Sequence, residues 1–391
     1  MNNCYLLNNE AQRAGGAIMN VGGGTFTAIG CKIMNNVAQS RGDSSDYEYD
    51  GQGGAVLNEG EMTLRDCTIM QNSAVYSGGV ANRFDDTINM RDKEAAVLLS
   101  NCLISENTAS KQGAGVYAAN GLYTASDTKP SVTMEKNTRI LSNTANYYGG
   151  GLYINKNCTV LDRDSIIAEN KAKLHGSGIF CDGTLQMSGA PVLKDNARSD
   201  KLENIYMTSN QTIQVVGAFR SGAYVSWPVS RYAAQQVITT GYGNFNGDAD
   251  AGQYFYPYGE SNYSKGHTAY TRDGEATINA NVVYLDEDGQ EQICYDYVEV
   301  NGNDQKSMGD DWYFLHNDVA LTERAVVMGG HAHIILGDGC TAKYGKGITV
   351  EEGTSISIYA QPGQDGKLVA NGVGDCAGIG IKRTALACSG R

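Results

Sequence analysis

The sequence predicts an all-β protein whose main element is a right-handed parallel β-helix, a solenoid with three short strands per coil. Three observations lead to this fold class. A short motif recurs at intervals of 26 to 36 residues, and a period of about 20 to 50 residues marks solenoids. The apolar runs are four to six residues long and rich in Val, Ile, Thr and Tyr, which favours strands over helices. Of 391 residues, 49 are Gly and 5 are Pro, a composition that suits an all-β chain.

The repeated motif is an Ile or Leu, two variable residues and an Asn. It ends at Asn9, Asn36, Asn72, Asn107, Asn143, Asn170 and Asn196. Five residues before the Asn stands a Cys in the first four copies, and Thr138, Ser165 and Pro191 in the last three. Most copies are followed by a Gly pair and a short aliphatic run. Matched residues at constant offsets indicate stacked coils, so residues 1–200 are predicted to form about seven coils.

Each part of the motif has a role in this geometry. Strands of successive coils lie about 4.8 Å apart, so the Ile or Leu side chains are expected to stack in the core. The Asn is expected at a bend, because it tolerates left-handed backbone angles, and its amide can pair with the Asn above and below. The Gly pair supplies the next bend, where a Cβ would clash. The seven Asn residues are therefore interpreted as a structural ladder.

The ten cysteines are interpreted mainly as buried thiols, because four of them repeat in one register of the motif. Stacked Cys side chains of parallel strands run side by side, so no disulfide is assigned among Cys4, Cys31, Cys67 and Cys102. The sequence gives no connectivity for Cys158, Cys181, Cys294, Cys340, Cys376 and Cys388.

Three coils are longer than the rest, and the excess is expected to leave the solenoid as loops at residues 40–50, 85–94 and 121–130. The last two loops are expected to form one lateral patch that binds a ligand through Asp85, Asp86, Tyr123 and Asp127. The first loop contains the tripeptide Arg-Gly-Asp, starting at Arg41. It could be an adhesive motif for integrin-type recognition, but a Gly- and Asp-rich loop also produces this tripeptide by chance. Calcium candidates there are Asp43, Asp46, Glu48 and Asp50, and the alternative is a solvated acidic loop.

A second pair of columns follows the glycines. The ninth position after the Asn holds Ile18, Ala81, Val116, Leu152 and Ile179, and the tenth holds Met19, Asn82, Tyr117, Tyr153 and Phe180. Alternation places the two columns on opposite faces. If the aliphatic column faces inward, Tyr117, Tyr153 and Phe180 form an exposed aromatic ladder flanked by Tyr147 and Tyr148. These rings could stack on a polysaccharide, or they could simply stabilise the sheet.

The repeat fades after Asn196. Residues 201–281 are interpreted as a Tyr-rich closing or junction region, and 282–391 as a β-hairpin around Asp288-Gly289 followed by a second solenoid. Asn244, Asn246, Asp248 and Asp250 alternate, but their spacing departs from that of an EF-hand loop. His331 and His333 share a strand face, which is a metal-ligand spacing, yet no third ligand is identifiable.

Charge and hydropathy exclude some partners. A net charge of -13 and a pI near 4.9 argue against nucleic acid and against an anionic membrane surface. No apolar run approaches the 18 or so residues of a membrane span. The sequence Met1-Asn2-Asn3 leads straight into a repeat, so we expect the chain to be part of a longer surface protein.

Two stretches resemble known families. The combination of G-G-A-[IV], at Gly15–Ile18 and Gly53–Val56, with [IL]-x-x-N resembles the repeats of polymorphic outer membrane proteins, which are autotransporter-type adhesins. This resemblance covers about residues 1–200, with Ile or Leu where that family has Phe and without its barrel. W-Y-F-L-H-N-D-V from Trp312 and H-I-I-L-G-D-G-C-T from His333 are similar to repeat-containing surface proteins of gut Firmicutes, over about 280–380. Both resemblances imply display at the cell surface or secretion, with adhesion or glycan contact.

The favoured function is therefore a non-catalytic, surface-displayed β-helix that binds glycans or host and matrix proteins through its lateral loops and aromatic face. The alternative is a polysaccharide lyase or glycoside hydrolase of the β-helix type. A glycosidase needs two facing carboxylates, and the nearest stacked pair is Glu169 and Asp195, which are interpreted as solvated turn residues. No catalytic residue is assigned, and calcium is the one cofactor considered.

Overall fold

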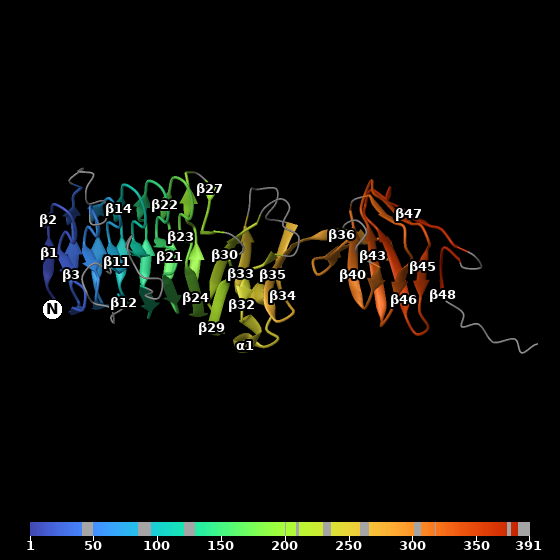
Figure 1. The fold of residues 1–391 in the computed structure, drawn as a ribbon, viewed down its shortest axis with the longest axis horizontal. Coiled ribbons are helices and arrows are strands. Elements are labelled where there is room, and N and C mark those ends of the chain that lie inside the picture. Colours follow the sequence, from blue (N-terminus) through green and yellow to red (C-terminus); the bar gives the residue numbers. More distant parts are fainter. Residues whose placement is uncertain are drawn as a thin grey trace, which may run out of the picture. The chain divides into compact units, whose positions relative to one another are not determined.

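The computed structural model describes residues 1–40, 50–84, 95–120, 130–199, 201–208, 211–229, 236–258, 266–300, 306–316, 318–373 and 377–381. The chain divides into two compact units. The first comprises Met1–Arg231, Gln236–Lys265 and Ala269–Ile278, and the second Tyr232–Gln235, Gly266–Thr268 and Asn279–Arg391. Both units consist almost entirely of strands (Figure 1).

The first unit is a parallel β-helix, which confirms the predicted fold class. Its strands form four stacked sheets, here called sheets I to IV (Figure 1). Sheet I contains β1 (Tyr5–Leu7), β5 (Lys32–Met34), β9 (Thr68–Met70), β13 (Leu103–Ser105), β17 (Arg139–Leu141), β21 (Ile166–Ala168), β25 (Val192–Lys194), β30 (Tyr224–Pro228) and β33 (Phe255–Tyr258). Sheet II contains β2 (Glu10–Ala11), β6 (Val37–Ala38), β10 (Ser73–Ala74), β14 (Thr108–Ala109), β18 (Thr144–Ala145), β22 (Lys171–Ala172), β26 (Ala197–Arg198) and β27 (Lys201–Leu202).

The other two sheets complete each coil. Sheet III contains β3 (Ile18–Asn20), β7 (Val56–Asn58), β11 (Val80–Phe84), β15 (Val116–Asn120), β19 (Leu152–Ile154), β23 (Ile179–Cys181) and β28 (Ile205–Met207). Sheet IV contains β4 (Thr25–Ile29), β8 (Glu61–Arg65), β12 (Ala96–Ser100), β16 (Ser131–Glu135), β20 (Thr159–Asp162), β24 (Thr184–Gly189), β29 (Ile213–Phe219) and β32 (Thr239–Thr240).

The coil therefore has the three predicted strands and an additional two-residue strand in sheet II, which follows the ladder Asn and was not predicted. Sheets I and IV continue beyond residue 200 through β30, β33, β29 and β32. The short helix α1 (Tyr242–Asn246) and the 3₁₀ turn η1 (Ala251–Gln253) follow. A further sheet contains β31 (Gln236–Val237), β35 (Glu275–Ala280) and β34 (His267–Arg272).

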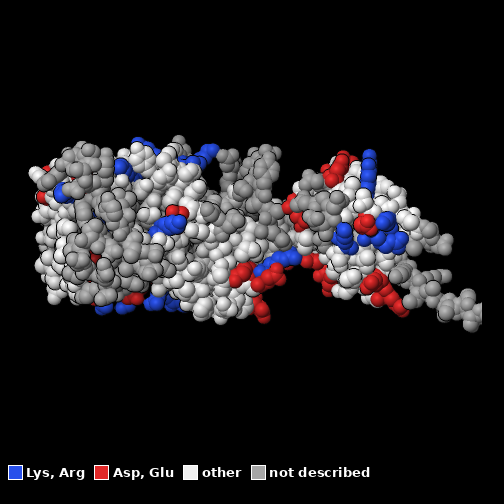
Figure 2. All heavy atoms as spheres, in the orientation of Figure 1, with Lys and Arg blue, Asp and Glu red and all other residues white. Residues whose placement is uncertain are grey.

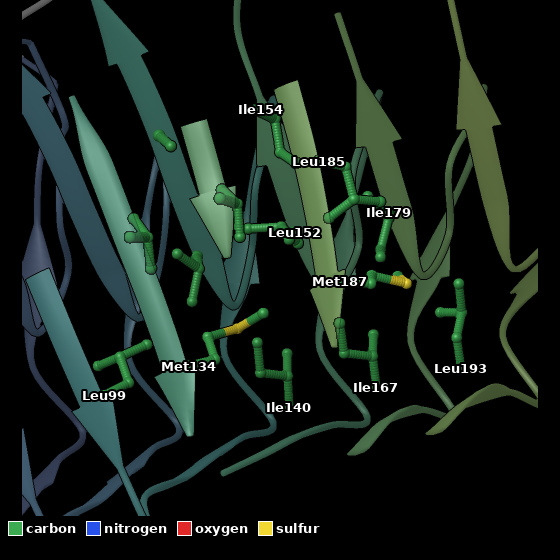
Figure 3. Close-up of a cluster of buried hydrophobic side chains, with 14 of the residues drawn as sticks. Leu99, Met134, Ile140, Leu152, Ile154, Ile167, Ile179, Leu185, Met187 and Leu193 are labelled. Atoms are coloured by element: carbon green, nitrogen blue, oxygen red, sulfur yellow. The ribbon is translucent and has the colours of Figure 1, made fainter. Parts of the chain in front are cut away.

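The core of the first unit consists of aliphatic columns. The motif Ile or Leu pairs in register along sheet I, from Leu6 and Ile33 through Ile140 and Ile167 to Leu193. Figure 3 shows this column facing side chains of sheets III and IV, among them Leu152 and Met187. Strand pairing one coil apart places like side chains in contact, so the interior is filled by stacked rows.

The ladder Asn is not the bend residue that the sequence analysis expected. The left-handed angle belongs to the residue immediately before it: Asn8, Asn35, Gln71, Glu106, Ser142, Glu169 and Asp195 have φ between 54° and 60°. Because this residue turns the chain, the Asn itself points inward, and Asn36 to Asn196 are completely buried. Glu169 and Asp195 are exposed turn residues, as interpreted from the sequence.

The Gly pair bends the chain as predicted. Gly53 has a φ of 67°, and a Cβ there would lie 2.2 Å from the carbonyl oxygen of Val56. Gly150, the second residue of a later pair, has no room for a Cβ because the carbonyl oxygen of Lys171 would be 2.3 Å away.

One register in the sequence analysis was wrong by a residue. Ala81 pairs with Tyr117 and Leu57, so it belongs to the outer column, and Val80 takes the inward position. The shift arises because the third coil has one residue fewer between its Asn and this strand. Asn82 instead joins Asn20 and Asn58 in a second, shorter ladder, with Nδ2 to Oδ1 distances of 2.7 and 2.8 Å.

The second unit begins with the predicted hairpin, β36 (Val282–Leu285) and β37 (Glu291–Cys294). Three parallel sheets follow and form a second solenoid. The first sheet contains β38 (Val298–Glu299), β40 (Asp311–Leu315), β43 (His331–Leu336) and β46 (Ser355–Ala360). The second contains β39 (Ser307–Met308), β42 (Ala325–Val327), β45 (Ile348–Val350) and β48 (Ile379–Ile381). The third contains β41 (Val319–Leu321), β44 (Thr341–Tyr344) and β47 (Lys367–Ala370). Val319 pairs with Ala342 and Ala325 with Ile348, so this coil is 23 residues long, shorter than those of the first unit.

Candidate functional site

The predicted aromatic ladder of the first unit exists as a stack of rings. Tyr117 and Tyr153 have ring centroids 5.3 Å apart, and Tyr153 and Phe180 are 5.1 Å apart. Tyr206 of β28 extends the stack at 5.4 Å from Phe180. The rings lie on the outer face of sheet III, because the strand alternation points Leu152 and Ile179 into the core.

The expectation that this ladder is exposed was wrong. Tyr117 and Phe180 each retain 8% of their accessible surface. Rings from the preceding turn pack on them: Tyr76 lies 5.5 Å from Tyr117, and Tyr148 lies 4.8 Å from Phe180. Burial raises the pKa of Tyr153 to about 12. The ladder therefore stabilises the sheet, which was the other interpretation of the pattern, and of its predicted flanking residues Tyr147 is the exposed one.

The predicted lateral patch and most of the calcium candidates lie outside the described residues; these are Arg41, Asp43, Asp46, Glu48, Asp85, Asp86, Tyr123 and Asp127. Asp50 is described, and its Oδ2 accepts a hydrogen bond from the Ser40 hydroxyl. In the alternating segment from Asn244 to Asp250, Asn246 Oδ1 accepts a hydrogen bond from the backbone N–H of Phe219, and Asp250 Oδ1 accepts one from that of Gly252. Across the described ranges, no group of three His, Cys, Asp or Glu side chains is placed to hold a metal ion.

A pocket of about 850 Å³ lies on the second unit. Its floor is the outer face of the sheet formed by β40, β43 and β46, and its wall is the β36–β37 hairpin with its turn. Gln361 Nε2 holds the hairpin over the sheet by donating to the carbonyl oxygen of Val283 at 3.1 Å. The hairpin covers Ile335 completely, and this contact leaves the aromatic residues beside it half-buried.

Aromatic rings form a continuous surface in and beside this pocket; His333, which links two of them, lies beside the lining. Trp312 stacks on His333 at 4.3 Å, and His333 stacks on His331 at 4.1 Å. Tyr359 lies 5.1 Å from Trp312. Tyr284, which comes from the hairpin, lies 4.8 Å from Trp312 and 5.0 Å from Tyr359. Trp312, His333 and Tyr359 come from the neighbouring strands β40, β43 and β46, so the ring surface runs across three successive coils.

Hydrogen bonds fix the polar side chains of the pocket. Ser355 and Ser357 hydroxyls lie 2.8 Å from the two ring nitrogens of His331. His333 Nδ1 lies 3.0 Å from the Tyr359 hydroxyl. Burial, and secondarily the neighbouring His331, hold the pKa of His333 below its usual value. His333 is therefore neutral near pH 7 and acts as a flat, uncharged ring.

The sequence analysis found His331 and His333 on one strand face, which the structure confirms. It did not identify Tyr284, Trp312 or Tyr359 as site residues. The signal was present in the alternation of Trp312 with Phe314 and of Ser357 with Tyr359, which places each pair on one face. It was missed because the spacing along the sheet changes from 21 residues (Trp312 to His333) to 24 residues (His333 to Ser357), without a constant Asn to mark the register.

The fold and this pocket define the chain as a parallel β-solenoid protein with a pocket lined by aromatic rings on its second unit. No protein-family model, no curated protein and no solved structure matches it. The helices within the described ranges are all too short or too polar to cross a lipid bilayer. The eight described cysteines are free thiols.

Proposed function

We propose that this protein is a secreted or cell-surface β-solenoid that binds glycans without modifying them, and that binding takes place in the pocket of the second unit. The observation that carries the proposal is the half-buried ring surface of Trp312, His333, Tyr359 and Tyr284. The resemblances to surface adhesins support the location, and the pocket replaces the aromatic ladder as the place of contact.

The chemistry of the pocket matches that of a saccharide. A sugar ring has C–H-rich faces, which pack on aromatic rings, and a rim of hydroxyls, which need hydrogen-bond partners. The pocket offers both, because Ser357, His331 and Gln364 border the rings. Its volume of about 850 Å³ falls within the roughly 300 to 1,000 Å³ of small-ligand sites. An oligosaccharide of a few residues would fit.

Rigidity also favours this pocket. The floor consists of paired strands, and the hydrogen bonds of His331 and His333 fix the orientation of their rings. A binding surface that is ordered before the ligand arrives loses less entropy on binding. The proposed site is therefore preformed.

Titration of the full chain with a panel of neutral, cationic and anionic oligosaccharides tests the proposal. Calorimetry and the fluorescence of Trp312 would report binding; the other tryptophan, Trp227, is 3% exposed and lies in the first unit. Trp312→Ala is expected to weaken binding at least tenfold, which corresponds to about 1.4 kcal/mol. Tyr147→Ala, which removes an exposed ring of the first unit, is the matched control and should leave affinity unchanged.

Two results would reject the proposal. One is saccharide binding that Trp312→Ala does not weaken, because the site would then lie elsewhere. The other is the release of new reducing ends or unsaturated products, which would support the alternative of a polysaccharide lyase or glycoside hydrolase.

A further inference from the structure

The charges around the pocket narrow the class of saccharide. The chain has a net charge of -13, but on the face drawn in Figure 2 the second unit carries charged side chains of both signs. The charge of the pocket therefore has to be taken from its own lining residues. The charged side chains that line the pocket are all acidic. Its lining contains Asp286, Glu287 and Asp288 from the hairpin turn, and the described lining residues include no Lys or Arg.

Asp286 organises this turn and remains ionised. Its Oδ1 accepts from the backbone N–H groups of Gln290 at 2.8 Å and Asp288 at 3.0 Å, and its Oδ2 accepts from Gln292 Nε2 at 2.8 Å. These hydrogen bonds hold the pKa of Asp286 below its usual value. Both oxygens of the Asp286 carboxylate therefore accept hydrogen bonds within the hairpin, and these bonds fix the positions of Glu287 and Asp288.

Glu287 and Asp288 are placed to meet a ligand. Both are exposed, and their side chains form no hydrogen bond or ion pair with any residue that the structure describes. They stand on the hairpin wall of the pocket, which also carries Tyr284, and the ring of Trp312 lies on the pocket floor. Aromatic faces attract cations, and a carboxylate beside them strengthens that attraction. Two independent features of the pocket therefore favour a positive group.

Resting on the glycan binding proposed above, we propose that the pocket selects a saccharide with a free, positively charged amine. The ammonium group lies between the Glu287 and Asp288 carboxylates and the rings of Tyr284 and Trp312, while the sugar face packs on Trp312 and Tyr359. Saccharides rich in uronic acid or sulfate meet three carboxylates and no fixed cation, so the pocket rejects them.

The comparison of ligands belongs at about pH 6 to 6.5, where carboxylates are ionised and sugar amines are largely protonated.

The experiment compares three trimers on the full chain: a β-1,4-linked glucosamine trimer, cellotriose, and a trimer of galacturonic acid. The first two differ by an ammonium group in place of the 2-hydroxyl on each of the three rings, so size is matched. The glucosamine trimer is expected to bind about tenfold more tightly than cellotriose, with a preference that declines as salt is added. The galacturonic acid trimer is expected to bind more weakly than cellotriose.

A double variant, Glu287→Gln with Asp288→Asn, is expected to bring the glucosamine trimer to within about twofold of cellotriose without weakening cellotriose. Glu352→Gln removes an exposed carboxylate of the same unit outside the pocket and should change neither affinity. Equal affinity of the unaltered protein for the two trimers, or a preference that survives in the double variant, overturns the charge selectivity and leaves the glycan-binding proposal intact. Failure of all three trimers to bind, or binding that ignores Trp312→Ala, overturns both.

Discussion

In the two solenoids of this chain, side-chain hydrogen bonds join successive coils in different places: in the interior of the first and at the surface of the second. In the first unit the connection is internal: each ladder Asn donates from Nδ2 to the Oδ1 of the next, at 2.8 to 3.0 Å from Asn9 to Asn196. Asn204 then accepts from Asn196 at 2.9 Å and its own N–H donates to the Tyr258 hydroxyl. The ladder thus ends in a Tyr from β33 rather than in open solvent.

The second unit has no such ladder among its described residues, and exposed carboxylates take its place. Asp338 accepts from the N–H of Gly363 at 2.9 Å, and Asp318 accepts from that of Thr341 at 2.7 Å. Exposed hydrogen bonds between coils compete with water and contribute less than buried ones. The comparison indicates that buried hydrogen bonds hold the coils of the first unit together, whereas the coils of the second unit are joined at the surface and part of an outer sheet face stays open beside the hairpin.

The largest effect is expected from the middle of the ladder. Asn107 Oδ1 accepts from the N and Nδ2 of Asn72, and its Nδ2 donates to Ile69 and Asn143. Asn107→Ala leaves these buried groups unpaired, so we expect a loss of about 4 kcal/mol in the free energy of unfolding. Urea denaturation followed by circular dichroism measures it.

Asn9→Ala is the control, because Asn9 is exposed at the start of the ladder and donates only to Asn36. Its cost is expected to stay below about 1 kcal/mol. Similar losses of unfolding free energy for the two variants would mean that a buried ladder Asn stabilises the fold no more than an exposed one. The contrast between buried hydrogen bonds in the first unit and exposed ones in the second would then fail.

The aromatic surfaces of the two units give the next test. Tyr153 is held between the rings of Tyr117 and Phe180, so Tyr153→Ala is expected to destabilise the first unit by about 3 kcal/mol and leave oligosaccharide affinity unchanged. Tyr359→Ala in the pocket is expected to weaken binding with a smaller loss of stability, because Tyr359 is half-buried on an open face. A loss of glycan affinity in Tyr153→Ala would restore the ladder as a binding surface.

These two regions also show how far the sequence could be interpreted. The Asn spacing was sufficient to predict stacked coils, because side chains at constant offset must lie above one another in a solenoid. Exposure of Tyr117 could not be predicted, since the rings that cover it come from a turn whose path no periodicity describes. The pocket was missed for a related reason: Tyr284 reaches Trp312 through hairpin packing, a contact between residues that share no repeat.

A buried carboxylate interrupts the core of the first unit. Asp162 pairs in register with Met134 and Met187 and is 1% exposed, with Ser165 as its hydrogen-bond partner. Burial raises the pKa of Asp162 to about 6. The folded protein therefore holds a proton that the unfolded chain releases above about pH 4, so the free energy of unfolding falls between about pH 4 and pH 6 and stays low above that.

Asp162→Asn removes this titration while keeping an acceptor for the Ser165 N–H. The variant is expected to be more stable by about 2 kcal/mol at pH 7.5 and about equal to the unaltered protein near pH 4. Thermal denaturation at the two pH values measures the difference. Asp195→Asn, at an exposed left-handed position that Asn accepts readily, should show no such pH dependence; a gain for Asp162→Asn that is equal at both pH values would contradict the role of burial.

The smallest effect concerns a matched pair of thiols. Cys102 Sγ donates to the carbonyl oxygen of Leu64 in the preceding coil at 3.2 Å, and Cys340 Sγ donates to that of Leu315 at 3.0 Å. The Cys102 pKa is raised by its hydrogen bond with Cys67 and by burial, and burial raises that of Cys340. Both thiols are therefore unreactive until the coil around them opens.

Alkylation of the native protein, followed by peptide mass spectrometry, compares how often the two coils open. If internal hydrogen bonds hold the first unit more firmly, Cys340 should be labelled about tenfold faster than Cys102, a difference of about 1.4 kcal/mol in opening free energy. Cys4 is half-buried at the start of its column and should react before either, which provides an internal reference for the reagent. Equal labelling rates at Cys102 and Cys340 would show that exposed carboxylates hold a coil closed as firmly as a buried Asn ladder does. The coils of the two units would then not differ in opening free energy.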